Sequence, residues 1–407
     1  MIRELKMTEK QYQLDRERDS TCLSRPIVWY FMLTAICVFG SRSIFAFLPF
    51  SELTYDIIRY GGTLGFLLFS FPKIKRKYYI WFLGLELFFM LSYLISYLLG
   101  YMLTENVLPY CISTLVICIP FCITIASIDD YDVLYRKLLY VSFPIAGIVI
   151  YYSFFSVFSV EYSMSASYQL VLTGAIHFNE VFKSKRLKLI YLLLVGLQLV
   201  TIFIRGARGP LLCLIVFIAV KTLLYFRNNT KVLAVSFIGI FSLVIAVQNI
   251  STIMNWVGER LNAAGLYSRN YQYILSDALF SDSGRGNFYK RAIELIVKNP
   301  VFGYGASSDV MLLGGQYTHS LPLELMFDYG ILIGGIIFMY LSIHVVHSFF
   351  IPDGTEQDLR MIFITQGYLM LFFSGTYLQS VNLFLFLGIA ISSIYVPRIK
   401  KRKIVSN

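Results

Sequence analysis

The apolar runs of this chain constrain its fold more than any other feature, because their lengths match the thickness of a lipid bilayer. The runs at 27–39, 78–103 and 189–204 are long enough to cross, or nearly cross, the hydrocarbon layer as helices. They are continuous rather than alternating in polarity, which argues against a barrel of strands. Hydrophobic residues make up 57% of the chain and charged residues 14%, outside the range of soluble domains. The sequence therefore predicts an all-α polytopic integral membrane protein.

Helical spans can be assigned along most of the chain. About twelve are expected, at 27–47, 55–71, 79–103, 107–128, 138–158, 166–182, 189–204, 210–226, 232–250, 323–346, 361–377 and 381–397. They divide the chain into a cytoplasmic N-terminal segment (1–26), a first group of spans (27–250), one large outer loop (251–321), a second group of spans (322–397) and a cytoplasmic C-terminal tail (398–407). The polar leader has no small-residue cleavage site, so the first span is expected to be retained.

Basic residues indicate how the spans are oriented. Lysine and arginine cluster in the N-terminal segment, at 73–77, at 183–186 and at 398–403. With about twelve spans, all of these clusters fall on the side that holds both termini, and the positive-inside bias makes this side cytoplasmic. The same placement accounts for the net charge of +11 without a nucleic-acid partner. The loop at 251–321 then lies outside the cytoplasm.

Most of the chemistry available to the chain lies in this outer loop. The segment 287–299 has apolar residues at helical spacing and charged residues mostly elsewhere around the axis, which is typical of an amphipathic helix at a membrane surface. Ser283 and Gly284 precede this helix, and Pro300 ends it. We therefore expect the loop to contain short amphipathic helices rather than irregular chain alone.

Two side chains of the loop suit a charged substrate. Arg285 stands at the N-terminal edge of the predicted helix, where its guanidinium and the backbone N–H groups can face a phosphate together. His319 precedes a membrane helix that carries Glu324 and Asp328 on its first turns, and this arrangement suits proton transfer. The simpler alternatives are a solvated or lipid-headgroup charge for Arg285 and a capping or packing group for His319.

A second pair of arginines lies in the very short turn between two apolar runs. Arg205 and Arg208 fall on the outer side by the topology above, where basic residues at the edge of the hydrocarbon call for an anionic partner. A diphosphate suits this role, because arginine binds it through two or more charge-assisted hydrogen bonds. Contact of both side chains with lipid headgroups is the alternative.

The order and spacing of the charged and glycine-rich motifs carry a family resemblance. The motifs are Arg205-Gly-Ala-Arg208-Gly at a helix end, Gly284-Arg285 followed by Glu294-Leu-Ile and Asn299-Pro-Val-Phe-Gly303-Tyr-Gly305, and His319-Ser-Leu-Pro-Leu-Glu324 followed by Gly330-Ile-Leu-Ile-Gly334. Together they resemble the bacterial superfamily of O-antigen polymerases and O-antigen ligases, membrane glycosyltransferases that act on undecaprenyl-diphosphate-linked glycans. The chain departs from the common pattern at Ser320, where asparagine is usual.

The resemblance implies a helical membrane enzyme of GT-C-like architecture that transfers a glycan from a lipid diphosphate to a sugar hydroxyl. An undecaprenyl-diphosphate-linked oligosaccharide is the implied donor, membrane lipid and a chain-length regulator protein are implied partners, and no metal or other cofactor is expected. The implied location is the bacterial inner membrane, with both termini cytoplasmic and the active site periplasmic. Because the leaving group is a diphosphate, cationic side chains can stabilise its developing charge in a low-dielectric site.

The resemblance also assigns roles to individual residues. Arg208 matches the superfamily's helix-end arginine and Arg285 its loop arginine, and both are expected to be catalytic. His319 matches the position that orients or deprotonates the acceptor hydroxyl. The further residues expected to bind diphosphate or glycan are Arg205, Arg42, Arg291, Tyr304 and Glu324.

Within the superfamily, the expected function is polymerisation of O-antigen or of a capsular or other surface polysaccharide, with a second lipid-linked repeat unit as acceptor. The segment 205–209 is closer to the polymerases than to the Thr-Arg-Ala type of the ligases. An O-antigen ligase, which moves the glycan to a lipid A-core acceptor, is the first alternative. A lipid-linked oligosaccharide flippase or other transporter is the second, although transporters often show two related halves with interrupted helices, which the sequence does not indicate.

Overall fold

The computed structural model describes residues 2–44, 51–101, 104–155, 164–205, 207–227 and 285–395. Within these ranges every regular element is a helix, as the continuous apolar runs predict. Among the helices described, those long and apolar enough to cross a membrane are six in number, Gln13–Gly40, Arg76–Leu98, Leu108–Ala126, Tyr131–Phe154, Arg208–Phe226 and Leu321–Phe349. The helical membrane class is therefore supported by the structure.

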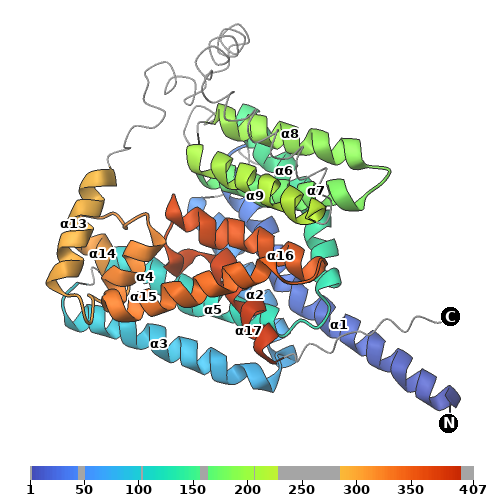
Figure 1. Cartoon of the computed structure of the whole chain (residues 1–407), viewed down its shortest axis with the longest axis horizontal. Coiled ribbons are helices and arrows are strands. Elements are labelled where there is room, and N and C mark those ends of the chain that lie inside the picture. Colours follow the sequence, from blue (N-terminus) through green and yellow to red (C-terminus); the bar gives the residue numbers. More distant parts are fainter. Residues whose placement is uncertain are drawn as a thin grey trace, which may run out of the picture.

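Figure 1 shows the arrangement of the helices. In the first part of the chain they are α1 (Ile2–Thr34), η1 (Ala35–Gly40), α2 (Glu52–Ser70), η2 (Phe71–Lys73), η3 (Arg76–Tyr78), α3 (Tyr79–Leu98), α4 (Thr104–Ile112), η4 (Ser113–Cys118), α5 (Ile119–Ala126), α6 (Tyr131–Phe155), α7 (Met164–Lys183), α8 (Lys188–Ile204) and α9 (Arg208–Phe226). In the last part they are α13 (Arg285–Lys298), α14 (Ser308–Leu312), α15 (Leu321–Phe349), α16 (Thr355–Phe363), η5 (Ile364–Leu369), η6 (Met370–Phe372), η7 (Tyr377–Gln379) and α17 (Val381–Tyr395).

Several predicted spans differ from simple membrane crossings. Helices α2 and α7 lie at the predicted spans 55–71 and 166–182, but neither is among the helices apolar enough to count as a candidate span. The predicted span 361–377 is broken into short helical pieces that end in an irregular segment at 373–376. The predicted span 232–250 lies outside the described residues. A total of about twelve spans therefore stays a prediction.

Helix α7 is less apolar than its neighbours because it takes part in a buried polar network. The ring of His177 is fully buried, with Nε2 2.9 Å from the Ser142 hydroxyl of α6 and Nδ1 3.1 Å from the Gln198 amide nitrogen of α8. That amide also donates to the Thr173 hydroxyl at 3.1 Å. These hydrogen bonds offset the cost of burying polar side chains and join α6, α7 and α8.

One end of the helical bundle, which we call the basic end, joins basic residues to acidic residues of other elements. The ion pairs are Lys73 with Asp19 (2.9 Å), Lys75 with Asp129, Lys183 with Asp358 (2.7 Å), Lys221 with Asp358, and Arg227 with Asp353 (3.6 Å). The basic clusters at 73–77 and 183–186, which are far apart in the sequence, are thus both tied into this end. Their common location is what the sequence-based topology requires.

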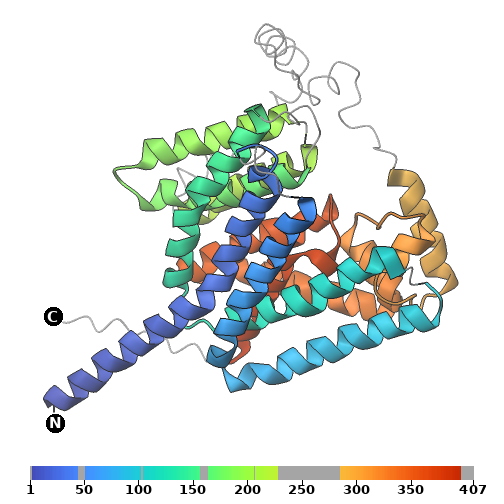
Figure 2. The ribbon, with the colours of Figure 1, turned by 180° about the vertical axis from the view of Figure 1, so that it is seen from behind.

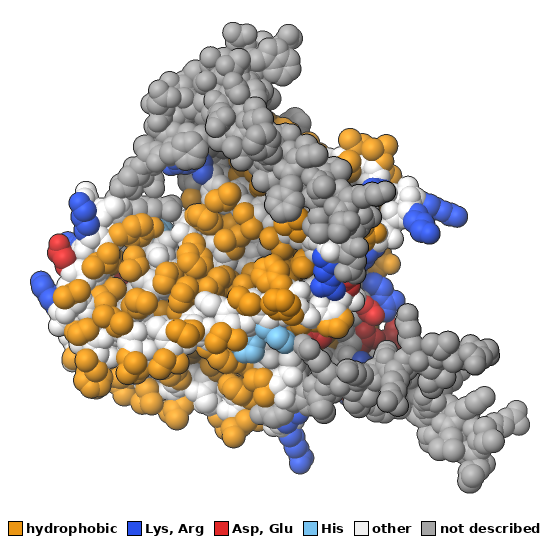
Figure 3. Space-filling model, in the orientation of Figure 1, with side chains coloured by type: hydrophobic (Ala, Val, Ile, Leu, Met, Phe, Trp, Pro, Cys, Tyr) orange, Lys and Arg blue, Asp and Glu red, His pale blue; other side chains and the backbone are white. Residues whose placement is uncertain are grey.

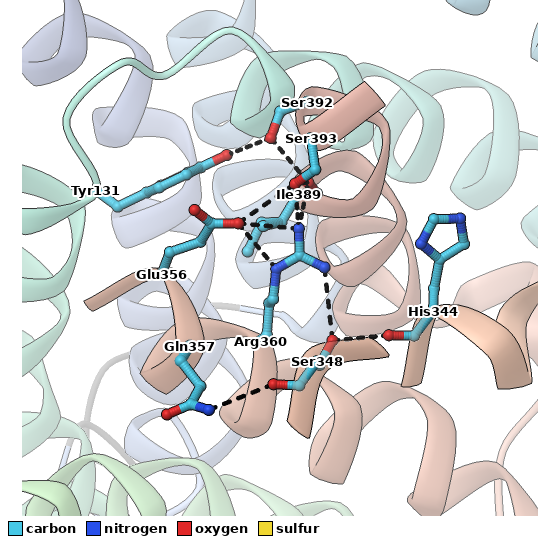
Figure 4. A network of polar contacts seen from close by, with 9 residues as sticks. All are labelled: Tyr131, His344, Ser348, Glu356, Gln357, Arg360, Ile389, Ser392 and Ser393. Carbon is cyan, nitrogen blue, oxygen red and sulfur yellow. Dashed lines mark hydrogen bonds and ion pairs between the residues drawn. The ribbon is translucent and has the colours of Figure 1, made fainter. Parts of the chain in front are cut away.

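A buried arginine holds the helices together near this end (Figure 4). Arg360 of α16 is fully buried and donates to the Glu356 carboxylate at 3.0 Å and to the Ile389 carbonyl at 3.0 Å. The Tyr131 hydroxyl lies 2.9 Å from the Ser392 hydroxyl one turn further along α17. A buried charge is costly unless it is paired and hydrogen-bonded, so these contacts fix α16 against α17.

The opposite end, which we call the cap end, carries the described part of the predicted outer loop. Figure 1 shows α13 and α14 at this end, far from the N-terminus. Helix α13 is the amphipathic helix predicted at 287–299, beginning two residues earlier. Its residues Ala292 and Ile296 are buried against Tyr304 and Phe327, and its charged residues Lys290, Arg291, Glu294 and Lys298 are all exposed. The amphipathic character of this segment is therefore confirmed.

Helix α15 is not one straight span. Gly330 has φ 78° and ψ 169°, a non-helical conformation that divides α15 into a short part, 321–329, and a long part, 331–349. A Cβ atom added to Gly334 would lie 2.3 Å from the Leu325 carbonyl oxygen, so the two parts fold sharply against each other. The segment predicted as a span at 323–346 is thus apolar and long enough to cross a membrane, but it is not one continuous helix. The long part alone rises about 28 Å, close to the thickness of the hydrocarbon layer.

The helices of the middle of the chain form a group of their own. Figures 1 and 2 show α7, α8 and α9 stacked together on one side, with α3 and α13 to α15 on the other. Helix α1 projects from the basic end in both views. Because α1 begins at Ile2, the expected boundary between segment and span at residue 26 falls inside a continuous helix.

Candidate functional site

The glycine-rich segment 299–305 forms a main-chain brace with the break in α15. The hydrogen bonds run from Tyr304 N to Phe327 O (3.0 Å), from Gly305 N to Asp328 O (2.9 Å) and from Ile331 N to Pro300 O (2.7 Å). At Gly303 a Cβ atom would lie 2.5 Å from the Asp328 carbonyl oxygen, so a larger residue could not approach this closely. Two separate parts of the sequence motif thus form one structural unit at the cap end.

The turn that leads to His319 is fixed by a buried carboxylate. Asp309 of α14 accepts hydrogen bonds from the backbone N–H groups of Thr318 (3.0 Å) and Val310 (2.9 Å). Burial raises the pKa of Asp309 to about 6, and these backbone N–H groups oppose the rise. Because Thr318 directly precedes His319, the Asp309 carboxylate determines where the chain enters α15.

The short part of α15 is held by two further buried carboxylates. Glu324 accepts hydrogen bonds from the Thr376 hydroxyl and from the Tyr377 N–H at 3.4 Å. The Asp328 carboxylate accepts a hydrogen bond from the Tyr377 hydroxyl at 2.6 Å, and the Tyr329 hydroxyl lies 2.9 Å from the same Tyr377 oxygen. These contacts give both acids a structural partner in the segment after η6.

His319 has a positive φ of 54°, which is uncommon outside glycine. Its ring lies against the Tyr317 ring, with centroids 4.1 Å apart. The Tyr317 hydroxyl accepts a hydrogen bond from the Gly375 N–H at 3.3 Å. The N-cap position of α15 belongs to Ser320 rather than to His319. A strained backbone and a supported ring favour a positioned side chain over a helix cap.

The two arginines of the short turn differ in environment. Arg205 ends α8, is buried, and places its guanidinium carbon 5.5 Å from the centre of the Tyr152 ring. Burial lowers the pKa of Arg205, and contact with Tyr152 opposes this. Arg208 begins α9 and is half-buried, whereas Gly206 lies outside the described residues. Both arginines therefore lie at the junction of two apolar helices, as predicted.

One segment contacts both the arginine turn and the His319 turn, and we call residues 373–377 the linking loop. Gly209, next to Arg208, is packed so closely that a Cβ atom there would lie 3.0 Å from the Phe373 Cβ and 3.0 Å from the Tyr168 hydroxyl. Two residues after Phe373, the backbone N–H of Gly375 donates its hydrogen bond to the Tyr317 hydroxyl. The linking loop thus brings the neighbours of Arg208 and of His319 into one region at the cap end.

The remaining predicted site residues lie in different settings. Arg285 begins α13, but its side chain is outside the described part of the chain. Arg42 and Arg291 are exposed, and their predicted binding of substrate stays a prediction. Tyr304 is buried, and its hydroxyl donates to the Leu295 carbonyl at 2.9 Å. Packing accounts for the burial of Tyr304 and Glu324, while their predicted substrate contacts also remain predictions.

Sequence reasoning missed the residues that connect these segments. Asp309, Tyr317 and the linking loop were not singled out, and the loop was placed inside the predicted span 361–377. The one available signal was Ser374-Gly375-Thr376, a turn-type cluster within an apolar run.

Comparison with known proteins identifies the family to which these motifs belong. A family model described as O-antigen ligase matches residues 192–339. The matched range contains the arginine turn, α13, α14 and His319, together with the brace at Gly330. No curated protein matches the chain. The family match covers the segment that carries these motifs, and it confirms their resemblance to the superfamily of O-antigen polymerases and O-antigen ligases.

Proposed function

We propose that this protein is a surface-polysaccharide polymerase that transfers a glycan from undecaprenyl diphosphate to a sugar hydroxyl of another lipid-linked repeat unit. The family match supports polymerase or ligase activity in general. The observation that carries the proposal is the linking loop. Through Phe373 and Gly209 it contacts the arginine turn, and through Gly375 and Tyr317 it supports His319.

This arrangement suits displacement of a diphosphate by a hydroxyl group. The acceptor oxygen forms a bond to the anomeric carbon of the donor, and the bond from that carbon to the diphosphate oxygen breaks. Arg208, with Arg205 and Arg285, stabilises the negative charge that develops on the departing undecaprenyl diphosphate. His319 accepts the proton that the acceptor hydroxyl loses.

The proposed reaction takes place on the periplasmic face of the bacterial inner membrane. The ion pairs of the basic end place the clusters at 73–77 and 183–186 together, and the positive-inside bias makes that end cytoplasmic. The cap end, with α13, α14 and His319, then faces the periplasm. This orientation delivers the glycan and its diphosphate to the edge of the bilayer, where the arginine turn is located.

Alanine and lysine substitutions test the diphosphate-binding role. Purified Arg208→Ala and Arg285→Ala proteins should form no polymer from a lipid-diphosphate repeat unit, whereas lysine should restore activity only in part, because a point charge cannot reproduce the two-pronged guanidinium contact. Lys290→Ala, which removes an exposed charge from α13, is the matched control and should remain active. Full-length polymer from either arginine variant would rule out that residue as essential.

The ligase is the second candidate, because the matching family model carries that description. Lipopolysaccharide from a strain lacking the gene separates the two functions. A single repeat unit on the lipid core indicates loss of a polymerase, and a bare core with polymer left on its lipid carrier indicates loss of a ligase. Accumulation of single lipid-linked units on the cytoplasmic face would instead identify a flippase and contradict both.

A further inference from the structure

An apolar groove of about 360 Å³ lies between α3 and α15, with α17 as its floor. All of the side chains that line it are aliphatic or aromatic, among them Trp81 and Phe88 of α3, Ile333 and Ile337 of α15, and Leu387 of α17. Its volume is within the range of about 300–1,000 Å³ that is usual for ligand pockets. A groove with these walls suits a hydrocarbon chain and offers no partner for a sugar or a phosphate.

The groove opens on an apolar surface of the protein. Figure 3 shows hydrophobic side chains spread over the face formed by α3 and α15. Ile333 and Ile336, which line the groove, are 44% and 61% exposed. Along α3 the lining extends from Trp81 to Phe89, a rise of about 12 Å, so that the groove can hold an extended segment of chain rather than a single ring.

The groove is continuous with the candidate site. Leu321 and Leu325 of the short part of α15 line its cap-end limit, and Leu321 is two residues from His319. Tyr377 of the linking loop also lines it, while its hydroxyl bonds to the Asp328 carboxylate. A lipid whose tail lies in the groove therefore has its polar end beside the residues that hold His319 and the linking loop.

We infer that this groove binds the hydrocarbon tail of the lipid-linked donor and so places the donor diphosphate at the cap end. The inference rests on the proposed function, and it assigns α3, α15 and α17 a role in selecting donors by their tails. The shared residues Leu321, Leu325 and Tyr377 favour the donor over bulk membrane phospholipid as the occupant. An acyl chain of bulk lipid would need no continuity with the reacting groups.

Two neighbouring tryptophan substitutions test the groove. Ile333→Trp fills it, whereas Leu332→Trp places the same bulk on the same helix at a position that is 67% exposed and does not line it. Transfer is measured with two donors that share one glycan diphosphate, one with a long polyprenyl tail and one with a tail of two isoprene units. Ile333→Trp should raise the KM for the long-tailed donor about tenfold, the effect of losing contacts of roughly two methylene groups. Its KM for the short-tailed donor, and both KM values of Leu332→Trp, should match those of the unchanged protein.

A second readout does not depend on activity. Native mass spectrometry should detect the long-tailed donor bound to the unchanged protein and to Leu332→Trp, and little of it bound to Ile333→Trp, with equal unfolding temperatures for all three proteins. Equal KM values for the two tryptophan variants, or phospholipid alone in the spectra of the unchanged protein, would overturn the groove assignment. The unchanged protein could also bind the long-tailed donor but transfer no glycan, while Ile333→Trp does not bind this donor. That result would overturn the proposed function and leave the groove assignment standing.

Discussion

Replacement of Gly330 by alanine should destabilise the cap end, because this residue adopts a conformation that is almost restricted to glycine. Its φ of 78° and ψ of 169° cost a residue with a side chain about 1–3 kcal/mol. The added Cβ atom would lie 2.3 Å from the Val301 carbonyl oxygen, so the chain must also shift. That shift breaks the hydrogen bond from Ile331 N to Pro300 O, a further loss of about 0.5–1.5 kcal/mol. The expected total is about 2–4 kcal/mol.

Gly335→Ala is the matched control for this substitution. Gly335 lies in the long part of α15, and a Cβ atom there would meet nothing within 4 Å. Alanine should therefore stabilise the helix by up to about 1 kcal/mol. Thermal unfolding of both variants in detergent, followed by glycan transfer assays, measures the difference. Equal unfolding temperatures for Gly330→Ala and Gly335→Ala would refute the proposed brace at the break.

Three further outcomes are expected. In a cysteine-free background, a cysteine at the exposed Gly314 should react with an impermeant reagent from outside and a cysteine at Lys75 should not, and the opposite pattern would reverse the orientation of the protein. His319→Ala should keep donor binding but lose about 10²–10⁴-fold in turnover, whereas turnover within a few-fold of the unchanged protein would exclude a role as base. The pKa of Asp309 is raised to about 6 by burial, so its stabilising contribution is lost as the pH rises through that value. The unfolding temperature should therefore fall between about pH 4 and pH 6.5, from the ordinary carboxyl pKa to the raised one, and Asp309→Asn should reduce this fall; an unchanged fall would assign it to other groups.

The sequence predicted the helical class and the location of most helices, because apolar length and the clustering of basic residues are local properties. It also predicted the amphipathic helix α13, whose apolar spacing matches its buried face. It did not show the breaks inside 323–346 and 361–377, where hydropathy is continuous although the helical backbone is not. Breaks in such runs depend on contacts between distant segments, such as Gly330 with Val301, and composition does not report these contacts.

The candidate site was predicted in part for the same reason. Arg205, Arg208 and His319 could be found because charged or ionisable groups beside apolar runs stand out in the sequence. The linking loop could not, since its importance comes from packing Phe373 against Gly209 and bonding Gly375 to Tyr317 across long sequence separations. Side chains that carry charge are visible in a sequence, whereas those that hold them in place are visible only in three dimensions.

The brace between segment 299–305 and the break in α15 has a consequence for how such proteins can diversify. Its hydrogen bonds join backbone N–H groups to backbone carbonyl oxygens, so they depend on the glycines that permit close approach and hardly at all on the side chains between them. Exposed positions such as Val301 and Phe302 can therefore change without loosening the frame around His319. Under the proposed function, a lineage that acts on a different sugar could vary such exposed residues and still keep the backbone arrangement that holds His319.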